Sequence, residues 1–274
     1  MYLVKIISIV GYKKSGKTAL AEKLIRGLKE YGRVGTIKHM HEGTLNPDQT
    51  DTYRHIASGS NMTIGIGSNE MVKIIPDVDL HAAIDELCDS GMNFAVVEGF
   101  KDSELSKISI DITAENTVKY IDKKQIFNEQ LIEELVQLTL QQKDYHTLKS
   151  LIHVVRSKPE IIKYSGAIGS FTGIVREITG NNVTKALELK QQDSAYEMIE
   201  DICSDLKKRD GITDVVMHHR TGLIRPGGDI VYIVVAAEHR QQLFPVLREA
   251  IDRLREEVQA PIIEMREQRV ELNG

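Results

Sequence analysis

The segment from Gly11 to Thr18, with the sequence GYKKSGKT, constrains the fold more than any other part of the chain. It matches the phosphate-binding pattern G-x-x-x-x-G-K-[ST] at each fixed position. Residues 3–10 before it form an apolar run that predicts a strand, and residues 17–31 after it carry leucines at helical spacing. A strand, a glycine loop and a helix in this order predict a binding site for the phosphates of a nucleoside triphosphate.

Each residue type in this loop has a defined role. The two glycines allow the backbone N–H groups to converge on phosphate oxygens, Lys17 supplies a charge for the β- and γ-phosphates, and the Thr18 hydroxyl is placed to bind Mg²⁺. The predicted nucleotide-binding residues are Gly11, Lys13, Lys14, Ser15, Gly16, Lys17 and Thr18.

A second acidic residue is expected to hold Mg²⁺, or its water, at the end of a neighbouring strand. Glu98 stands where the apolar strand predicted at 94–97 ends, and its alternative role is a capping carboxylate. Asp51 competes for the metal role because it opens a predicted helix after a loop. We therefore predict Thr18, Glu98 and Asp51 as candidate Mg²⁺ ligands.

Three further polar residues leave their roles open. His39 and His41 follow the predicted strand 34–37, where they could share a metal ion, although ordinary loop histidines are the favoured explanation of the pair. Asp122 follows another predicted strand and could contact a purine base.

The pattern of predicted strands and helices changes near residue 145. In the first half strands and helices alternate, which predicts an α/β wound sheet. In the second half helices are fewer for each strand, which predicts an α+β domain with a largely antiparallel sheet. The predicted strands are 3–10, 34–37, 61–67, 71–75, 94–97, 107–113, 117–121, 166–176, 183–189, 212–219 and 229–237, and the predicted helices are 17–31, 79–90, 127–141, 195–209 and 240–257.

Length and composition agree with two domains and exclude several classes of protein. The 274 residues suggest two domains, and we place a polar linker at 143–150 between domains at 1–142 and 151–274. The net charge is −5 and neither half is basic, so we expect no nucleic-acid partner. No apolar run is long enough to span a membrane. Cys88 and Cys203 form no disulfide framework, which favours buried thiols in a reducing cytoplasm.

The second half offers candidate ligands for an anion. Arg176 ends the strand predicted at 166–176, while His239 and Arg240 lie where another strand passes into a helix. Arginine side chains suit phosphate, so the three residues together predict a site, although surface ion pairs would explain any one of them.

The first half resembles the MobB family of molybdopterin-guanine dinucleotide biosynthesis adapter proteins over about residues 1–142. The segments that carry the resemblance are Gly11–Thr18, Val34–His39 with His41, Asp51–Tyr53, Ala57–Gly59 and Val97–Lys101. The resemblance implies a dimeric domain that binds GTP with Mg²⁺, hydrolyses it weakly, and assists a guanylyltransferase in attaching the nucleotide to molybdopterin.

The second half resembles MoaE, the large catalytic subunit of molybdopterin synthase, over about residues 151–272. The segments that carry this resemblance are Gly166–Arg176, His218–Gly222, Pro226–Asp229 and Ala236–Arg240. It implies a dimerising α+β domain that binds precursor Z or molybdopterin. It also implies a ubiquitin-like small subunit as partner, whose C-terminal thiocarboxylate delivers sulfur. Arg176, His239 and Arg240 fall on the family's arginine and its His-Arg pair.

The sequence departs from this family at its two active-site lysines. Their places fall near Arg255 and Glu264, and no lysine occurs after Lys208. Arginine stays protonated and glutamate reverses the charge, so the catalytic residues of this domain are left unassigned.

Three functions follow from these patterns. We expect a GTP-binding adapter domain fused to a domain that binds molybdopterin or its precursor without sulfur transfer, in a cytoplasmic homodimer. The first alternative is an active bifunctional synthase in which Arg255, Arg176 or a partner's residue replaces the lysines. The second is a scaffold whose nucleotide site sets assembly with a guanylyltransferase. The sequence leaves open whether a molybdenum or a tungsten cofactor is served.

Overall fold

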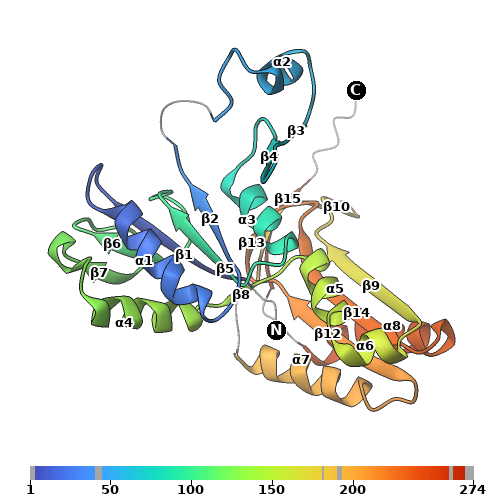
Figure 1. Cartoon of the computed structure of the whole chain (residues 1–274). Coiled ribbons are helices and arrows are strands. Elements are labelled where there is room, and N and C mark those ends of the chain that lie inside the picture. Colours follow the sequence, from blue (N-terminus) through green and yellow to red (C-terminus); the bar gives the residue numbers. More distant parts are fainter. Residues whose placement is uncertain (1–3, 41–44, 181, 190–192, 259–261, 269–274) are drawn as a thin grey trace. The chain divides into compact units, whose positions relative to one another are not determined.

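The computed structural model describes residues 4–40, 45–180, 182–189, 193–258 and 262–268 (Figure 1). The chain divides into two compact units, a first unit of residues 3–145 and a second unit from residue 146 onward. The first unit is an α/β unit and the second an α+β unit, so the predicted fold class is confirmed for both.

The first unit is built on a mainly parallel sheet with strand order β2-β5-β1-β6-β7. The short strand β8 adds to β1 in the antiparallel direction. The elements are β1 (Val4–Gly11), α1 (Lys17–Lys29), β2 (Val34–Lys38), α2 (Asp51–Ala57), β3 (Thr63–Ile66), β4 (Met71–Ile74), α3 (Leu80–Asp89), β5 (Phe94–Glu98), β6 (Lys107–Ile110), β7 (Thr117–Ile121), the 3₁₀ helix η1 (Lys123–Gln125), α4 (Glu129–Leu140) and β8 (Asp144–Tyr145).

Alternating side chains of β1 bury both faces of this sheet. Ile7 and Ile9 pack with α1 and α4 on one face, while Val4 and Ile6 pack with α3 on the other. The carboxyl ends of β1, β2 and β5 therefore meet at one edge of a sheet that is covered on both sides.

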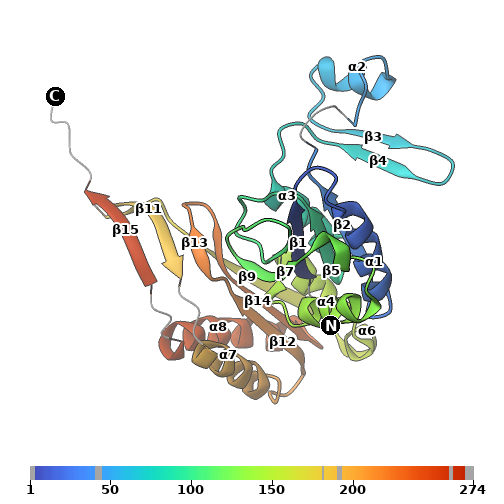
Figure 2. The ribbon, with the colours of Figure 1, turned by 90° about the vertical axis from the view of Figure 1, so that its left-hand side faces the viewer.

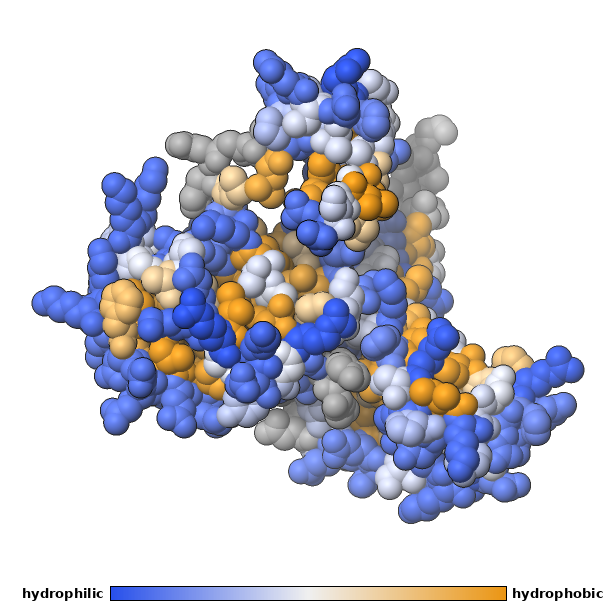
Figure 3. Space-filling model, in the orientation of Figure 1, coloured by the Kyte–Doolittle hydropathy of each residue, from blue (hydrophilic) through white to orange (hydrophobic). Residues whose placement is uncertain are grey.

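An excursion of the chain separates β2 from β5. Strands β3 and β4 pair with each other as an antiparallel hairpin, and Figure 2 shows this hairpin and α2 standing away from the parallel sheet of the same unit. Large apolar side chains are exposed on the hairpin, and apolar atoms gather over it in Figure 3. They belong to Ile64, Ile66, Met71 and Val72.

The second unit contains two antiparallel sheets, one with strand order β12-β14-β9 and one in which β11 pairs with β10, β13 and β15. The elements are α5 (Leu148–Arg156), α6 (Pro159–Tyr164), β9 (Ala167–Ile174), β10 (Ile178–Thr179), β11 (Asn182–Leu189), α7 (Asp193–Leu206), β12 (Ile212–His219), β13 (Gly222–Ile224), β14 (Asp229–Ala237), α8 (Arg240–Glu257) and β15 (Ile262–Gln268).

The central strand β14 is buried on both faces, which explains its nearly continuous apolar sequence. Val231, Ile233 and Val235 pack against α7 and α8. The side chains between them face the other side of the sheet, where α5 contacts β14.

Five elements of the second unit lie outside the predicted pattern. Helices α5 and α6 and strands β10, β13 and β15 were not predicted. The predicted linker, residues 143–150, contains β8 and the first turn of α5, because Thr147 and Ser150 form a capping box that starts this helix.

Candidate functional site

The phosphate loop, residues Gly11–Thr18, joins the end of β1 to the start of α1. Gly16 adopts a φ of +97°, and a Cβ atom there would lie 2.5 Å from Cδ1 of Ile126. A Cβ on Gly11 would lie 2.5 Å from the Ser15 Oγ and 3.0 Å from the Ile110 carbonyl oxygen. Both glycines of the motif are therefore required by the close packing of the loop, as its sequence pattern predicts.

The side chains of the loop are arranged for an anionic ligand. The Lys17 ammonium donates to the carbonyl oxygens of Gly11 at 3.0 Å and Tyr12 at 2.8 Å, which holds it over the loop. The Ser15 hydroxyl is buried and has no hydrogen-bond partner within the described part of the chain. An unsatisfied buried hydroxyl beside a lysine fits a loop that closes around phosphate oxygens.

Thr18 and Glu98 meet above the edge of the sheet. The Thr18 hydroxyl, in the first turn of α1, lies 3.0 Å from each carboxylate oxygen of Glu98, at the end of β5. Lys38 stands opposite Glu98 in the parallel β2–β5 pair, and its ammonium lies 3.4 Å from Glu98 Oε1. A hydroxyl and a carboxylate are oxygen ligands of the kind that Mg²⁺ prefers, so these residues fit the metal role predicted for them.

The alternative ligand Asp51 is placed elsewhere. It is the first residue of α2, where its exposed carboxylate pairs with Arg54 at 3.5 Å. Thr18 makes its carboxylate contact with Glu98 and not with Asp51.

The structure separates the other polar candidates of the first unit. His39 stacks on Phe100 with the ring centroids 4.4 Å apart. His41 lies outside the described residues, and no cluster of three or more potential metal ligands occurs among the residues that are described. The Asp122 carboxylate accepts from the Lys124 amide and caps η1.

A cavity of about 1050 Å³ opens beside the phosphate loop. The phosphate loop, the ends of β2 and β5, and the start of α3 line it. The lining residues include Gly11, Lys13, Lys17, His39, Asp79, Leu80, His81 and the segment Glu98–Ser103. Residues Asp79–His81 were not predicted as part of the site, because nothing in the sequence pattern places the start of α3 beside the end of β1.

A buried lysine supports the wall of this cavity. The Lys107 side chain is fully buried, and its ammonium donates to the carbonyl oxygens of Ser103, Leu105 and Glu115. Burial is the main cause that lowers the pKa of Lys107. Lys107 thus stabilises the segment that follows Glu98 through hydrogen bonds to its carbonyl groups. The sequence pattern assigned no role to this lysine.

The anion-ligand candidates of the second unit do not meet within one chain. Arg176 follows β9, whose residue Ile174 pairs with Asp229 at the start of β14. His239 and Arg240 follow the far end of β14. A strand of this length separates its ends by about 26 Å, so a single chain does not bring the three residues together and the anion site stays a prediction.

Each of these residues is exposed at its own end of the sheet. Arg176 lines a cavity of about 210 Å³ with Thr179 and Leu187. Arg240 begins α8 and His239 is its N-cap, with the His239 amide donating to Gln242 at 3.1 Å.

The positions of the missing lysines lie on different elements. Arg255 is an exposed residue in the last turn of α8. Glu264 is in β15, where its backbone pairs with Leu187 of β11. Nothing in the described residues supplies a lysine at either place.

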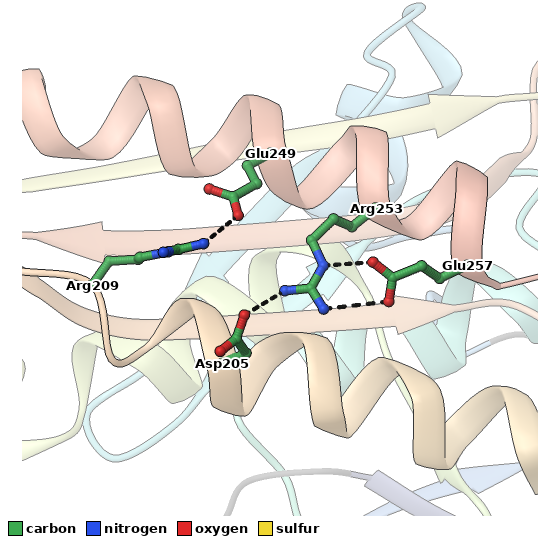
Figure 4. Close-up of polar contacts among 5 residues, drawn as sticks. All are labelled: Asp205, Arg209, Glu249, Arg253 and Glu257. Carbon is green, nitrogen blue, oxygen red and sulfur yellow. Dashed lines mark hydrogen bonds and ion pairs between the residues drawn. The ribbon is translucent and has the colours of Figure 1, made fainter.

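Ion pairs hold α8, the helix that carries Arg255, against α7 and the segment that follows α7 (Figure 4). Arg253 donates to Asp205 of α7 at 2.7 Å and to Glu257 at 2.6 Å, and Arg209 pairs with Glu249 at 2.6 Å. Hydrogen bonding to Glu257 raises the pKa of Arg253 and lowers that of Glu257.

The buried Tyr232 and the partly buried His218 lie near the β12–β13 turn. Burial, reinforced by the neighbouring His146, lowers the pKa of His218 to about 2. The Tyr232 hydroxyl donates to Asp229 at 2.8 Å, and burial raises the pKa of Tyr232. His218 is therefore neutral in the folded protein, a state that its sequence context did not predict.

None of the helices in the described ranges is long and apolar enough to cross a membrane. The thiols of Cys88 and Cys203 are buried, as predicted, and neither forms a disulfide within the described residues.

The first unit has the fold and loop geometry of a P-loop α/β domain, and the second is an antiparallel α+β domain. Residues 6–139 match the Molybdopterin guanine dinucleotide synthesis protein B family, and residues 140–257 match the MoaE protein family. The chain belongs to the family of molybdenum cofactor biosynthesis proteins that join a MobB-type domain to a MoaE-type domain. The predicted resemblance of both halves is confirmed.

Three relatives show how the match is distributed. The chain is 31% identical over 257 residues to a probable molybdopterin synthase of Haloferax volcanii, which covers 92% of each chain. It is 31% identical over 108 residues to a putative molybdopterin-guanine dinucleotide biosynthesis adapter protein of Methanocaldococcus jannaschii, covering 39% of this chain and 45% of the relative. It is 34% identical over 129 residues to the molybdopterin synthase catalytic subunit of Thermoplasma volcanium, covering 47% of this chain and 88% of the relative.

Proposed function

We propose that the first unit binds GTP with Mg²⁺ and hydrolyses it slowly. The observation that carries this proposal is the contact of Thr18 with Glu98 beside a phosphate loop whose Ser15 hydroxyl is buried without a partner. Lys17 holds the β- and γ-phosphates, while Thr18 and Glu98 hold Mg²⁺, whose charge neutralises the terminal phosphate when bound. Hydrolysis of GTP is slow because the sequence of the first unit offers no candidate for an arginine finger or for a glutamine that positions the attacking water.

Calorimetric titration of GTP and ATP in Mg²⁺ buffer tests this function. GTP is expected to bind more tightly than ATP, and Lys17→Ala is expected to weaken GTP binding while the unfolding temperature stays unchanged. Equal affinity of the wild type and Lys17→Ala for GTP would contradict the proposed role of the phosphate loop in GTP binding. Single-turnover hydrolysis at a rate typical of activated GTPases would contradict the slow turnover.

We propose that the second unit binds molybdopterin or precursor Z without transferring sulfur. The absence of any lysine after Lys208 supports this proposal, because only a group that can lose a proton near neutral pH can act as base or nucleophile. Arg176, His239 and Arg240 are the proposed anion ligands. Since they lie at opposite ends of β14, two copies of the chain must contribute to one shared anion site.

One observation favours an active synthase as the second candidate function. The Haloferax volcanii relative, which matches along 92% of this chain, carries the name probable molybdopterin synthase. In this case Arg255, Arg176 or a partner's residue takes the place of the lysines. Sulfur transfer from a thiocarboxylated small subunit to precursor Z separates the candidates, because robust product formation by the unmodified chain excludes the binding-only function.

The proposed partners follow from the two halves. They are a molybdopterin guanylyltransferase for the first unit, a ubiquitin-like small subunit for the second, and a second copy of this chain. The exposed apolar residues of the β3–β4 hairpin support a homodimer. A pure scaffold remains as a third function, and it is favoured if a variant that has lost GTP binding still assembles with the guanylyltransferase.

A further inference from the structure

Lys38 lies beside Thr18 of the phosphate loop and Glu98 at the end of β5. It is the last residue of β2 and pairs in register with Glu98 of β5. Residues in register on parallel strands point to the same side of the sheet. The register of β2 and β5 therefore places the Lys38 and Glu98 side chains next to each other.

The ammonium of Lys38 contacts both oxygen groups that fit a metal ion. It lies 3.4 Å from the Thr18 Oγ1 and 3.4 Å from Glu98 Oε1. The Thr18 Oγ1 itself lies 3.0 Å from Glu98 Oε1, so the three atoms form a nearly equilateral triangle. A positive charge is thus already present beside the oxygens of Thr18 and Glu98.

This arrangement makes two cations compete for one carboxylate. The Glu98 side chain is only 15% exposed, so its charge is partly shielded from water and has few alternative partners. The Lys38 side chain is 56% exposed and ends on a flexible stem, so it can leave without disturbing the core. A divalent cation at Thr18 and Glu98 would be repelled by the ammonium as long as Lys38 stays there.

We infer that Lys38 makes metal binding at Thr18 and Glu98 depend on the nucleotide. Without nucleotide, its ammonium neutralises Glu98 and weakens divalent-cation binding. With nucleotide, the polyphosphate offers Lys38 another anionic partner, so the ammonium leaves Glu98 and adds to the positive charge around the phosphates. This inference rests on the proposed nucleotide site and gives a role to a residue outside the phosphate loop.

Manganese titration without nucleotide tests the first half of the inference. Free Mn²⁺ is followed by electron paramagnetic resonance with the full chain. We expect Lys38→Met to bind Mn²⁺ about fivefold more tightly than the wild type, the size of a partly exposed ion pair. Lys38→Arg keeps the charge and is expected to behave as the wild type. Unchanged Mn²⁺ affinity in Lys38→Met overturns the inference.

Two further variants exclude simpler explanations. Lys29→Met removes the same charge from the exposed last turn of α1 and is expected to leave Mn²⁺ binding at the wild-type level. The double variant Lys38→Met with Glu98→Gln is expected to lose the added Mn²⁺ affinity. If Lys29→Met also tightens binding, or if the double variant keeps it, a general charge effect replaces the role of Lys38.

Titration of GTP in EDTA tests the second half. We expect Lys38→Met to bind GTP about fivefold more weakly than the wild type without metal, because one charge near the phosphates is lost. Unchanged GTP affinity of Lys38→Met overturns this half. If the wild type binds no nucleotide at all, the proposed function fails, whereas the Mn²⁺ titration without nucleotide still decides whether Lys38 and a metal compete.

Discussion

Gly99 and His39 lie so close together that a Cβ atom on Gly99 would come within 2.7 Å of the His39 Cβ. Gly99 has a φ of +104°, a conformation that side-chain-bearing residues rarely adopt. Its neighbour Phe100 stacks on the His39 ring. The chain therefore turns sharply directly after Glu98, and this turn places one wall of the phosphate-loop cavity.

Replacing this glycine is expected to destabilise the first unit. Gly99→Ala combines a strained φ with a steric overlap, so we expect its free energy of unfolding to fall by about 1–3 kcal/mol in a urea titration. Gly59→Ala is a matched control, because Gly59 has a φ of +101° and a Cβ atom added to it would meet no atom within 4 Å. Equal losses in the two variants would show that the contact with His39 has no energetic weight.

Glu98 is expected to act through the metal. Glu98→Gln keeps the shape and removes the charge, so we expect weaker dependence of nucleotide binding on Mg²⁺, while affinity in EDTA changes little. The measurement is a GTP titration with and without Mg²⁺. Asp51→Asn is the control, since Asp51 pairs with Arg54 on α2. If Asp51→Asn loses the Mg²⁺ dependence and Glu98→Gln keeps it, the two roles are exchanged.

The partly buried His218 is expected to make the second unit sensitive to acid. The pKa of this group is about 2 in the folded protein, against 6.5 for a histidine in an unfolded chain. Below pH 6.5 the unfolded chain takes up a proton that the folded chain does not, so stability is fully present above that pH and is lost as the pH falls. One such proton changes the free energy of unfolding by about 1.4 kcal/mol per pH unit.

Chemical denaturation at pH 7.0 and pH 5.5 measures this effect. We expect His218→Gln to lose less stability between these two pH values than the wild type, whatever its stability at pH 7.0. His153→Gln changes an exposed histidine of α5 in the same unit and is expected to follow the wild type. A wild-type slope in His218→Gln would show that His218 takes no part in the acid sensitivity.

Restoring the missing lysines is expected to create or raise sulfur transfer. The double variant Arg255→Lys with Glu264→Lys supplies two groups that can lose a proton when a dry or cationic site lowers their pKa. We expect molybdopterin formation from precursor Z to rise by about a hundredfold, the usual effect of positioned acid–base groups. The unmodified chain is the reference, and high activity in it would show that the lysines are dispensable here.

The phosphate loop could be predicted largely from the sequence because its geometry is local. The spacing of Gly11, Gly16 and Lys17 defines the loop, and Glu98 was found because parallel strands bring their carboxyl ends to one edge. Lys38 was not assigned a role, since its position depends on the register between β2 and β5. That register is set by packing along the whole strands and not by a short motif.

In the second unit the sequence held a signal that the prediction did not use. Leu151, Val154 and Val155 stand at helical spacing, and Pro159 suits the first turn of a helix, so α5 and α6 were predictable. The separation of Arg176 from His239 was not predictable, because it depends on the antiparallel pairing of β9 with β14. The residue types alone show that these side chains can bind an anion, but they do not show at which end of the sheet each side chain lies.

The chain leaves the sheet after β2 and returns only at β5, yet these two strands are neighbours, with Lys38 opposite Glu98. Lys38 and Glu98 stand at the points of departure and return, beside Thr18 of α1, and the β3–β4 hairpin adds no strand to the parallel sheet. Substitutions in the exposed hairpin can therefore accumulate without altering the register that holds Lys38 opposite Glu98.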